Sequence, residues 1–146
     1  MTGYFKNEVA TKEAFTEDGW LKTGDVGRID RDGHLFILER LKDVIISGGA
    51  NIYASELEDV IAGIPGVMES AVVGVPHEKW GETPRAFLVL KAGASLTEEA
   101  VIEWMRSRLA HYKCPTSVVF VESLPRTVTG KIDKKAVRAE LVGLAS

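Results

Sequence analysis

From about residue 42 onward, short β-rich runs alternate with stretches that have the spacing of amphipathic helices, and this alternation restricts the fold more than any other feature. The β-rich runs are Val44–Ile46, Val67–Val75, Ala86–Leu90 and Val118–Val121. Runs of this length are far too short to cross a bilayer, and strands mixed with helices indicate a small globular domain. We therefore predict an α+β fold in which a short antiparallel sheet is flanked by helices.

Three stretches of this region are predicted to be helical. Ser55 and Glu58 have the spacing of a capping box, which predicts a helix over residues 56–62. Thr97 is placed to cap a second helix that continues to residue 110. A final helix is predicted over residues 134–141, because its apolar side chains fall on one side. Residues 76–85, PHEKWGETPR, are expected to form a polar loop that is too long for a tight hairpin.

The first 41 residues have a different character. Asn7 can cap a short helix over residues 7–15, and the runs Val26–Ile29 and Leu35–Leu38 flank a glycine-containing turn, which predicts a hairpin. One helix and one hairpin cannot bury enough apolar surface to be stable alone. Residues 1–41 are therefore interpreted as the tail of a larger N-terminal domain, and residues 42–146 as a second domain.

Composition and charge exclude several classes of function. The net charge of −3, with lysines and arginines scattered among acids, argues against nucleic acid as the main partner. The single cysteine, Cys114, excludes an internal disulfide framework and fits a reducing compartment. Because the first residues lack the apolar core of a signal peptide, a cytoplasmic protein is expected. His34, His77 and His111 lack metal-ligand spacing with each other, with Cys114 and with nearby acids, so no metal site is predicted.

The segment TVTGKIDK places Lys131 directly after a glycine, in a flexible loop before a helix. A lysine there can reach a distant anion, because its ammonium is a compact charge on a long stem. The commoner alternative is a turn lysine that only solvates the start of a helix. The segment is not a phosphate-binding P-loop, because Pro125 and Ile132 occupy positions that require glycine and Ser or Thr.

Two further segments have side chains or backbone suited to a ligand. Asp25 follows a glycine at the start of a strand, where its carboxylate could accept two hydrogen bonds from a vicinal diol such as ribose. It could equally cap its own backbone. The glycines of residues 47–51, SGGAN, would let a ligand approach the backbone, or they form a simple bend after a buried strand. Arg40 and Lys42 lie between these segments, and each taken singly is most often a solvated surface charge.

In order along the chain, GWLKTGDVG, ILERLKDVIISGGANIYASELED, RLAHYKCP and LPRTVTGKIDK resemble the last conserved motifs of the adenylate-forming superfamily. This superfamily comprises acyl-CoA synthetases, firefly-type luciferases and the adenylation domains of nonribosomal peptide synthetases. The resemblance covers essentially the whole chain and is greatest to fatty-acid and related acyl-CoA ligases. It implies that residues 42–146 form the mobile C-terminal lid domain of such an enzyme.

The resemblance also implies a two-step reaction. A carboxylic acid attacks the α-phosphate of ATP, which carries Mg²⁺, and the thiol of coenzyme A then displaces AMP from the acyl-adenylate. Asp25 would bind the ribose hydroxyls of ATP, Arg40 would support the same sugar, and Asn51 would point toward the adenylate.

The other implied roles belong to three positions that work when the lid moves. Lys131 would bridge the substrate carboxylate and the α-phosphate during adenylation. Lys42 would be the hinge about which the lid rotates, and Gly49 would line the tunnel for the pantetheine arm. A lysine that joins two mutually repelling anions is chemically reasonable, because its charge offsets their repulsion in the transition state.

In this family the phosphate loop, the adenine pocket and the acyl pocket lie upstream of the segment that corresponds to Gly3. We therefore expect a C-terminal fragment that is inactive alone and that works with its own N-terminal domain on a fatty or other carboxylic acid. The alternative is a stand-alone module of the same lid fold that binds a nucleotide, coenzyme A or a protein.

Overall fold

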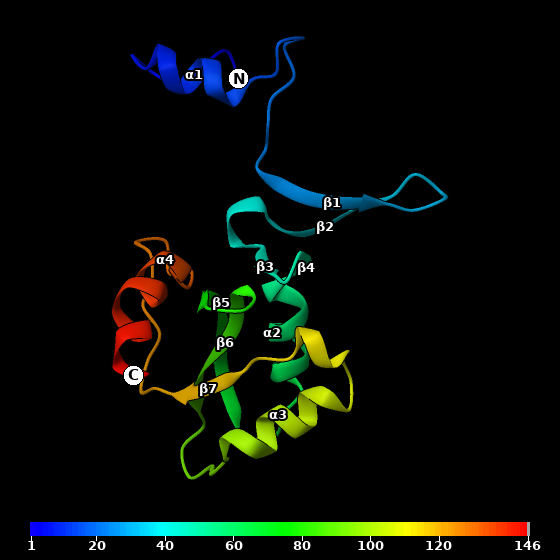
Figure 1. Cartoon of the computed structure of the whole chain (residues 1–146). Coiled ribbons are helices and arrows are strands. Elements are labelled where there is room, and N and C mark those ends of the chain that lie inside the picture. The colour runs from blue at the N-terminus through cyan, green and yellow to red at the C-terminus, as the bar shows by residue number, and fades with distance from the viewer. Residues whose placement is uncertain (146) are drawn as a thin grey trace. The chain divides into compact units, whose positions relative to one another are not determined.

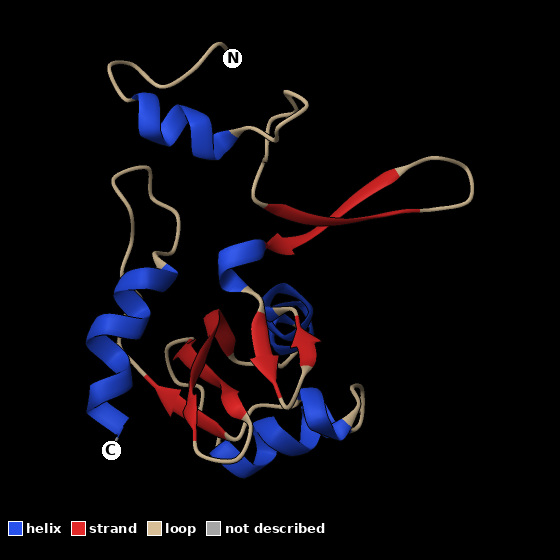
Figure 2. Cartoon of the chain, turned by 45° about the horizontal axis from the view of Figure 1, so that its top comes forward, coloured by secondary structure: helices blue, strands red, loops and turns tan. Residues whose placement is uncertain are grey.

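The computed structural model describes residues 1–145. The chain folds as two compact units, one over Met1–Lys42 and the other from Asp43 onward. Figure 1 shows their elements in chain order, and Figure 2 distinguishes helices from strands. Among the described residues, we find no helix with the length and apolar character needed to span a membrane.

The first unit consists of one helix and one hairpin. Helix α1 (Glu8–Ala14) begins where it was predicted, because the Asn7 side chain accepts a hydrogen bond from the Ala10 N–H at 3.0 Å. Strands β1 (Asp25–Ile29) and β2 (Leu35–Arg40) pair antiparallel, which confirms the predicted hairpin. Many of its large apolar side chains are exposed, including Phe5, Trp20, Ile29, Leu35 and Ile37.

The second unit is built on a five-stranded sheet. Its strands are β3 (Ile45–Ser47), β4 (Ala50–Ile52), β5 (Val67–His77), β6 (Gly81–Leu90) and β7 (Ser117–Phe120). The order is β4-β3-β6-β5, and β7 also pairs with β6. The first four strands are antiparallel neighbours, as predicted, whereas β7 is parallel to β6. The parallel pairing arises because the chain crosses through α3 before it returns to the sheet.

The prediction of a long polar loop over residues 76–85 is wrong. Strands β5 and β6 pair from Val67↔Leu90 to His77↔Gly81, so Glu78–Trp80 alone connect them. Two prolines make this segment resemble a loop in the sequence. Pro84 lies at the point where the partner of β6 on this edge changes from β3 to β7. Its carbonyl accepts the Thr116 N–H at 3.0 Å on that edge, so the missing N–H of the proline would also point there. No strand there requires an N–H from residue 84.

Helices cover both faces of the sheet (Figures 1 and 2). Helices α2 (Ala54–Ala62) and α3 (Glu98–Arg106) pack on one face, around Ile45, Leu57, Val72, Leu88 and Met105. The C-terminal segment packs on the other face; it starts as α4 (Lys134–Ala136), continues as a π-helical turn over Val137–Leu141 and ends in a 3-10 turn over Val142–Ala145. This second cluster includes Ala71, Val73, Phe87, Leu124 and Val137.

The caps show where the helix predictions succeed and fail. Thr97 caps α3 through the Ala100 N–H at 3.3 Å, although the helix ends at Arg106 rather than at residue 110. The capping box predicted at Ser55 is wrong, because α2 begins at Ala54 and Tyr53 is its N-cap residue. Glu58, the other member of that box, instead accepts the Val72 N–H of β5 at 2.7 Å.

Candidate functional site

Lys131 lies in a closed hairpin rather than in the flexible loop expected from the sequence. The Thr127 N–H donates to the Lys131 carbonyl at 2.8 Å, and the Gly130 N–H donates to the Thr127 carbonyl at 2.9 Å. Gly130 has φ of +83°, which closes a turn of the type that ends in a left-handed residue. Lys131 is therefore the first residue after the turn, and it is exposed.

Three contacts hold this hairpin, residues 126–132, which we call the Lys131 turn. Arg126 and Ile132 form an antiparallel bridge at its base. The Arg126 guanidinium donates to the Gly130 carbonyl at 2.7 Å and also forms an ion pair with Glu69 of β5. After the turn, the Asp133 side chain accepts N–H groups at the start of α4. Arg126 and Glu69 were not identified from the sequence, because they lie 57 residues apart.

Gly48 and Gly49 form the two-residue turn between β3 and β4. Ser47 pairs with Ala50, and the glycines have φ of +56° and +83°, so both need the left-handed region that glycine adopts without strain. An added Cβ at Gly48 would lie 2.8 Å from the Trp80 ring, whereas a Cβ at Gly49 would meet no described atom within 4 Å. The space beside Gly49 is therefore open, as the tunnel role expected for it requires. Asn51 lies on β4 of the same hairpin and is exposed.

A pocket of about 370 Å³ lies beside this hairpin and within the second unit. We call it the aromatic pocket; its lining is Ser47, Gly48, Ala50, Trp80, Thr83, His111, Tyr112, Cys114 and Thr116. Trp80 and Tyr112 expose 45% and 60% of their surface, so two aromatic rings are available to a ligand. Burial raises the pKa of the Cys114 thiol, which makes it a poor nucleophile in this wall.

Asp25 and Arg40 lie opposite each other at one end of the β1–β2 ladder. The Arg40 Nε lies 2.9 Å from the Asp25 Oδ1, and another guanidinium nitrogen donates to the Thr23 carbonyl at 3.1 Å. The structure thus brings together two residues that the sequence analysis assigned to the same sugar. The second carboxylate oxygen of Asp25 keeps acceptor capacity for a hydroxyl group.

Lys42 lies in a single 3-10 turn, Leu41–Asp43, at the boundary of the two units. Its side chain is exposed, whereas the next residue, Asp43, is buried. Arg138 of the C-terminal segment lies 3.4 Å from the Asp43 carboxylate. Asp43 is therefore the first residue packed into the second unit, and Lys42 is the exposed residue that precedes it.

Two other groupings do not form the site. Asp30, Asp32 and His34 bring ligand atoms within 4.8 Å of one another, which corrects the expectation that His34 has no such neighbours. The Asp30 carboxylate, however, accepts the N–H groups of Asp32 and His34 at 2.9 Å, and these bonds, led by that of His34, lower its pKa. The cluster is thus explained by closure of the β1–β2 turn.

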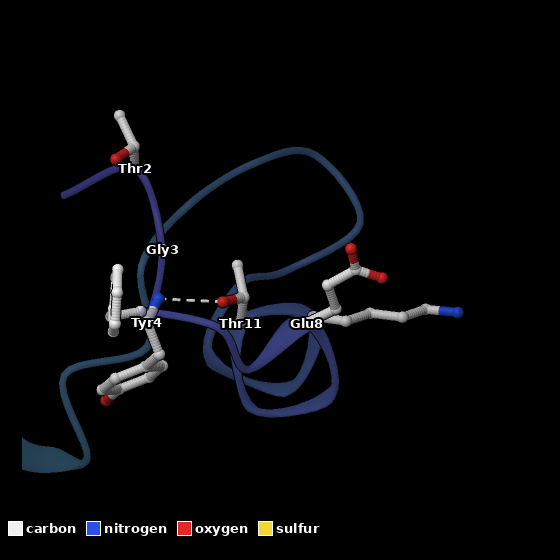
Figure 3. Close-up of a pocket in the computed structure, with 7 residues that line it drawn as sticks. Thr2, Gly3, Tyr4, Glu8 and Thr11 are labelled. Atoms are coloured by element: carbon white, nitrogen blue, oxygen red, sulfur yellow. Dashed lines mark hydrogen bonds between the residues drawn. The ribbon is translucent and has the colours of Figure 1, made fainter.

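The second grouping is an open hollow of about 570 Å³ around α1, formed only by residues of the N-terminal segment. Figure 3 shows the Tyr4 N–H donating to the Thr11 hydroxyl across it, at 2.9 Å. None of the site residues predicted from the sequence lies in it.

Comparison with known proteins identifies the family to which the chain is related. Residues 56–131 match the family described as the AMP-binding enzyme C-terminal domain. The long-chain-fatty-acid–CoA ligase FadD13 of Mycobacterium tuberculosis is 48% identical over 137 residues, which are 94% of this chain and 27% of that protein. The chain therefore spans about 27% of the length of this curated relative.

Solved structures show the same fold at similar identity. ATP-bound MatB from Rhodopseudomonas palustris superposes with a TM-score of 0.90 and 41% identity, over 99% of this chain and 29% of that one. The o-succinylbenzoate CoA synthetase of Bacillus subtilis, solved with an acyl-adenylate intermediate, gives a TM-score of 0.86 and 40% identity, over 97% and 28% of the two chains. Because the family match covers just over half of its 146 residues, this chain belongs to the AMP-binding enzyme C-terminal domain family.

Proposed function

We propose that the second unit is the mobile lid of an ATP-dependent acyl-CoA ligase, and that the first unit is the end of its adenylation domain. The enzyme joins a fatty or related carboxylic acid to ATP, releases pyrophosphate, and transfers the acyl group from the adenylate to coenzyme A with release of AMP. The observation that carries this proposal is an exposed lysine, Lys131, held on a closed turn of a lid-family domain. The similarity to a fatty-acid–CoA ligase supports the substrate class.

The first half-reaction needs a cation between two anions. A substrate carboxylate and the α-phosphate repel each other, and the Lys131 ammonium offsets this repulsion as charge builds in the transition state. Because the ammonium is exposed in this chain, the upstream domain has to supply the closed, water-poor site in which the charge acts strongly. The bridge at the base of the Lys131 turn and the hydrogen bond from Arg126 to Gly130 fix the backbone position from which the Lys131 side chain extends.

In this proposal, three of the candidate residues contact the nucleotide. Asp25, oriented by Arg40, accepts the ribose hydroxyls through its remaining lone pairs. Asn51, which lies on β4, forms a hydrogen bond to the adenylate through its side-chain amide. Mg²⁺ arrives with the phosphates of ATP, and we assign no residue of this chain to it, since Oδ1 of Asp30 accepts two backbone N–H groups and its Oδ2 lies 3.2 Å from the His34 Nδ1.

The second half-reaction needs the lysine withdrawn and a path opened for the thiol. Rotation at Lys42, which precedes the anchored Asp43, exchanges the Lys131 turn for the β3–β4 hairpin. Gly49 then leaves room for the pantetheine arm. The aromatic pocket next to Gly48 can hold the adenine of coenzyme A, because the Tyr112 ring is 60% exposed and can stack on a base, whereas the Trp80 ring already has the Lys79 ammonium 4.5 Å from its centroid.

The exposed apolar side chains of the first unit support an upstream partner domain. Large apolar side chains in a stable domain are normally gathered into a core. The two buried clusters draw only on residues of the second unit, whereas Phe5, Val9, Trp20 and Ile29 are each more than half exposed. We assign these side chains to the interface with the rest of the adenylation domain.

The test joins this chain to the upstream domain of the FadD13 relative and measures the two half-reactions separately. Lys131→Ala should abolish adenylate formation from a fatty acid and ATP, yet largely spare thioester formation from supplied acyl-adenylate. Lys135→Ala is the matched control, since Lys135 is also an exposed lysine near the turn. Equal loss in both half-reactions would refute the role of Lys131.

One observation favours a second function. The aromatic pocket is lined by residues of a single unit, so it needs no other domain in order to exist. A stand-alone module that binds coenzyme A or AMP is therefore the alternative. Calorimetry with each ligand and the isolated chain distinguishes the two, because tight binding by the chain alone favours the module.

A further inference from the structure

We infer that Arg126, anchored by Glu69, is a positioning residue that presents Lys131 as part of the rigid lid. This inference deepens the proposed function, and it rests on that function for the reaction that the lysine serves. It concerns a contact between the turn and the sheet, and the argument begins with the shape of β5.

Strand β5 contains a bulge that turns Glu69 toward the C-terminal segment. The register of β5 with β6 shifts between Val67 and Glu69, so Met68 is the extra residue. Val67 packs in the cluster under α2 and α3, whereas Ala71 and Val73 pack in the cluster under the C-terminal segment. Without the bulge, Val67 and Glu69 would point to the same face, because side chains alternate along a strand. With it, Val67 stays in one core and Glu69 reaches the other side.

On that side, Arg126 uses two nitrogens for two different partners. One nitrogen donates to the Gly130 carbonyl at 2.7 Å, and another pairs with the Glu69 carboxylate. A guanidinium can do this because its donors have a fixed planar arrangement, whereas the ammonium of a lysine is a single point charge. Arg126 therefore ties Gly130, one residue before Lys131, to β5, whose backbone pairs with β6 along most of its length.

Other contacts of the turn are local and would not orient it. The Thr127 and Gly130 hydrogen bonds close the hairpin, but they lie within it. Val128 at the tip is fully exposed, so the tip has no packing of its own to hold it. The Ile132 side chain, which packs against the second buried cluster, and the Arg126–Glu69 pair attach the hairpin to the domain. The first acts at its base and the second near Lys131.

The consequence for mechanism is that the backbone of Lys131 moves together with the whole lid. A preorganised side chain loses little freedom on reaching its site, and misplacement of a reacting group by about 1 Å can reduce the rate as much as 10²-fold. Arg126 thus serves adenylation and has no part in the thioester step, when the turn has been withdrawn.

The first test follows amide hydrogen exchange of the 146-residue chain by NMR. Arg126→Ala should speed exchange of the Thr127 and Gly130 amides by about fivefold, near the upper range for a partly exposed ion pair. Amides of the β5–β6 ladder should keep their protection, which shows that the fold survives. In Arg126→Lys and in Glu69→Gln, the exchange rates of these amides should lie between those of the wild type and of Arg126→Ala. Arg106→Ala is the control for loss of an exposed arginine. Unchanged exchange in Arg126→Ala would overturn the inference.

The second test uses the chain joined to the upstream domain of the FadD13 relative. Arg126→Ala should slow adenylation at least about tenfold, as expected for a misplaced group, while thioester formation from supplied adenylate stays near the wild-type rate. Partial recovery in Arg126→Lys supports positioning, and equal loss of both half-reactions overturns it. If the unmodified assembly forms no adenylate, the proposed function fails, whereas the exchange result still decides whether Arg126 holds the turn.

Discussion

The two glycines of the β3–β4 turn provide a quantitative test of the packing around Trp80. Gly48→Ala and Gly49→Ala each force an L-residue into the left-handed region, at a cost of about 1–2 kcal/mol. Only Gly48→Ala also drives a methyl group to 2.8 Å from the Trp80 Cε3. Displacing a packed ring costs about a further 1–3 kcal/mol, and the lower end applies because the ring is 45% exposed and can move outward. We expect losses of about 2–3 kcal/mol for Gly48→Ala and about 1–2 kcal/mol for Gly49→Ala.

The measurement is urea unfolding of both variants and the unmodified chain, followed by far-UV circular dichroism. Gly49→Ala is the internal control, because it also places an L-residue at positive φ but lacks the contact with the Trp80 ring. The midpoint of unfolding should fall further for Gly48→Ala, with the dependence on urea unchanged. Equal losses in the two variants would refute the argument that the Trp80 ring fills the space over residue 48.

Three further predictions concern charges and the thiol. Asp43→Ala leaves Arg138 without its partner and should lower the free energy of unfolding by about 1–2 kcal/mol in urea titrations; an unchanged value would show that the contact does not anchor the segment. The hydrogen bond from Lys113 to Glu56 raises the lysine pKa, so this pair stabilises the fold below pH 10.5, the ordinary lysine value, and the stabilisation is lost as the pH rises through the raised pKa. Glu56→Gln should therefore flatten the fall of the melting temperature in that alkaline range, and a curve parallel to the wild type would contradict this. Because burial raises the pKa of Cys114, a thiol reagent at neutral pH should label the folded chain much more slowly than the urea-unfolded chain; similar rates would contradict the burial.

The elements that could be predicted from the sequence are those set by local hydrogen bonds and spacing. Asn7 and Thr97 cap their helices as predicted, because an N-cap acts on N–H groups only a few residues away. The same reasoning failed at Ser55, because β4 ends at Ile52 and α2 already begins at Ala54, so Ser55 lies inside the helix and is not its N-cap. Residues 76–85 misled it too, because a proline at a strand junction cannot be distinguished in sequence from a proline in a loop.

The candidate site divides in the same way. Lys131, Asp25 and Gly49 could be selected as candidates because each follows or forms a glycine turn, which is a local signal. Their supports could not be located, since Glu69 meets Arg126 across 57 residues and Asp43 meets Arg138 across 95. The sheet topology determines which distant residues meet, and the local sequence pattern around each residue does not contain this information.

The parallel strand β7 affects how this domain can be made. Strand β6 is the middle of the sheet, and the part of its edge from Arg85 to Leu88 is completed only by Ser117–Phe120. During synthesis, that backbone edge emerges from the ribosome well before its partner, and it stays open to pairing with other chains in the meantime. A nascent polypeptide that ends before Ser117 therefore exposes an unpaired strand edge. The need for chaperone protection is greatest while residues 90–117 are being synthesised.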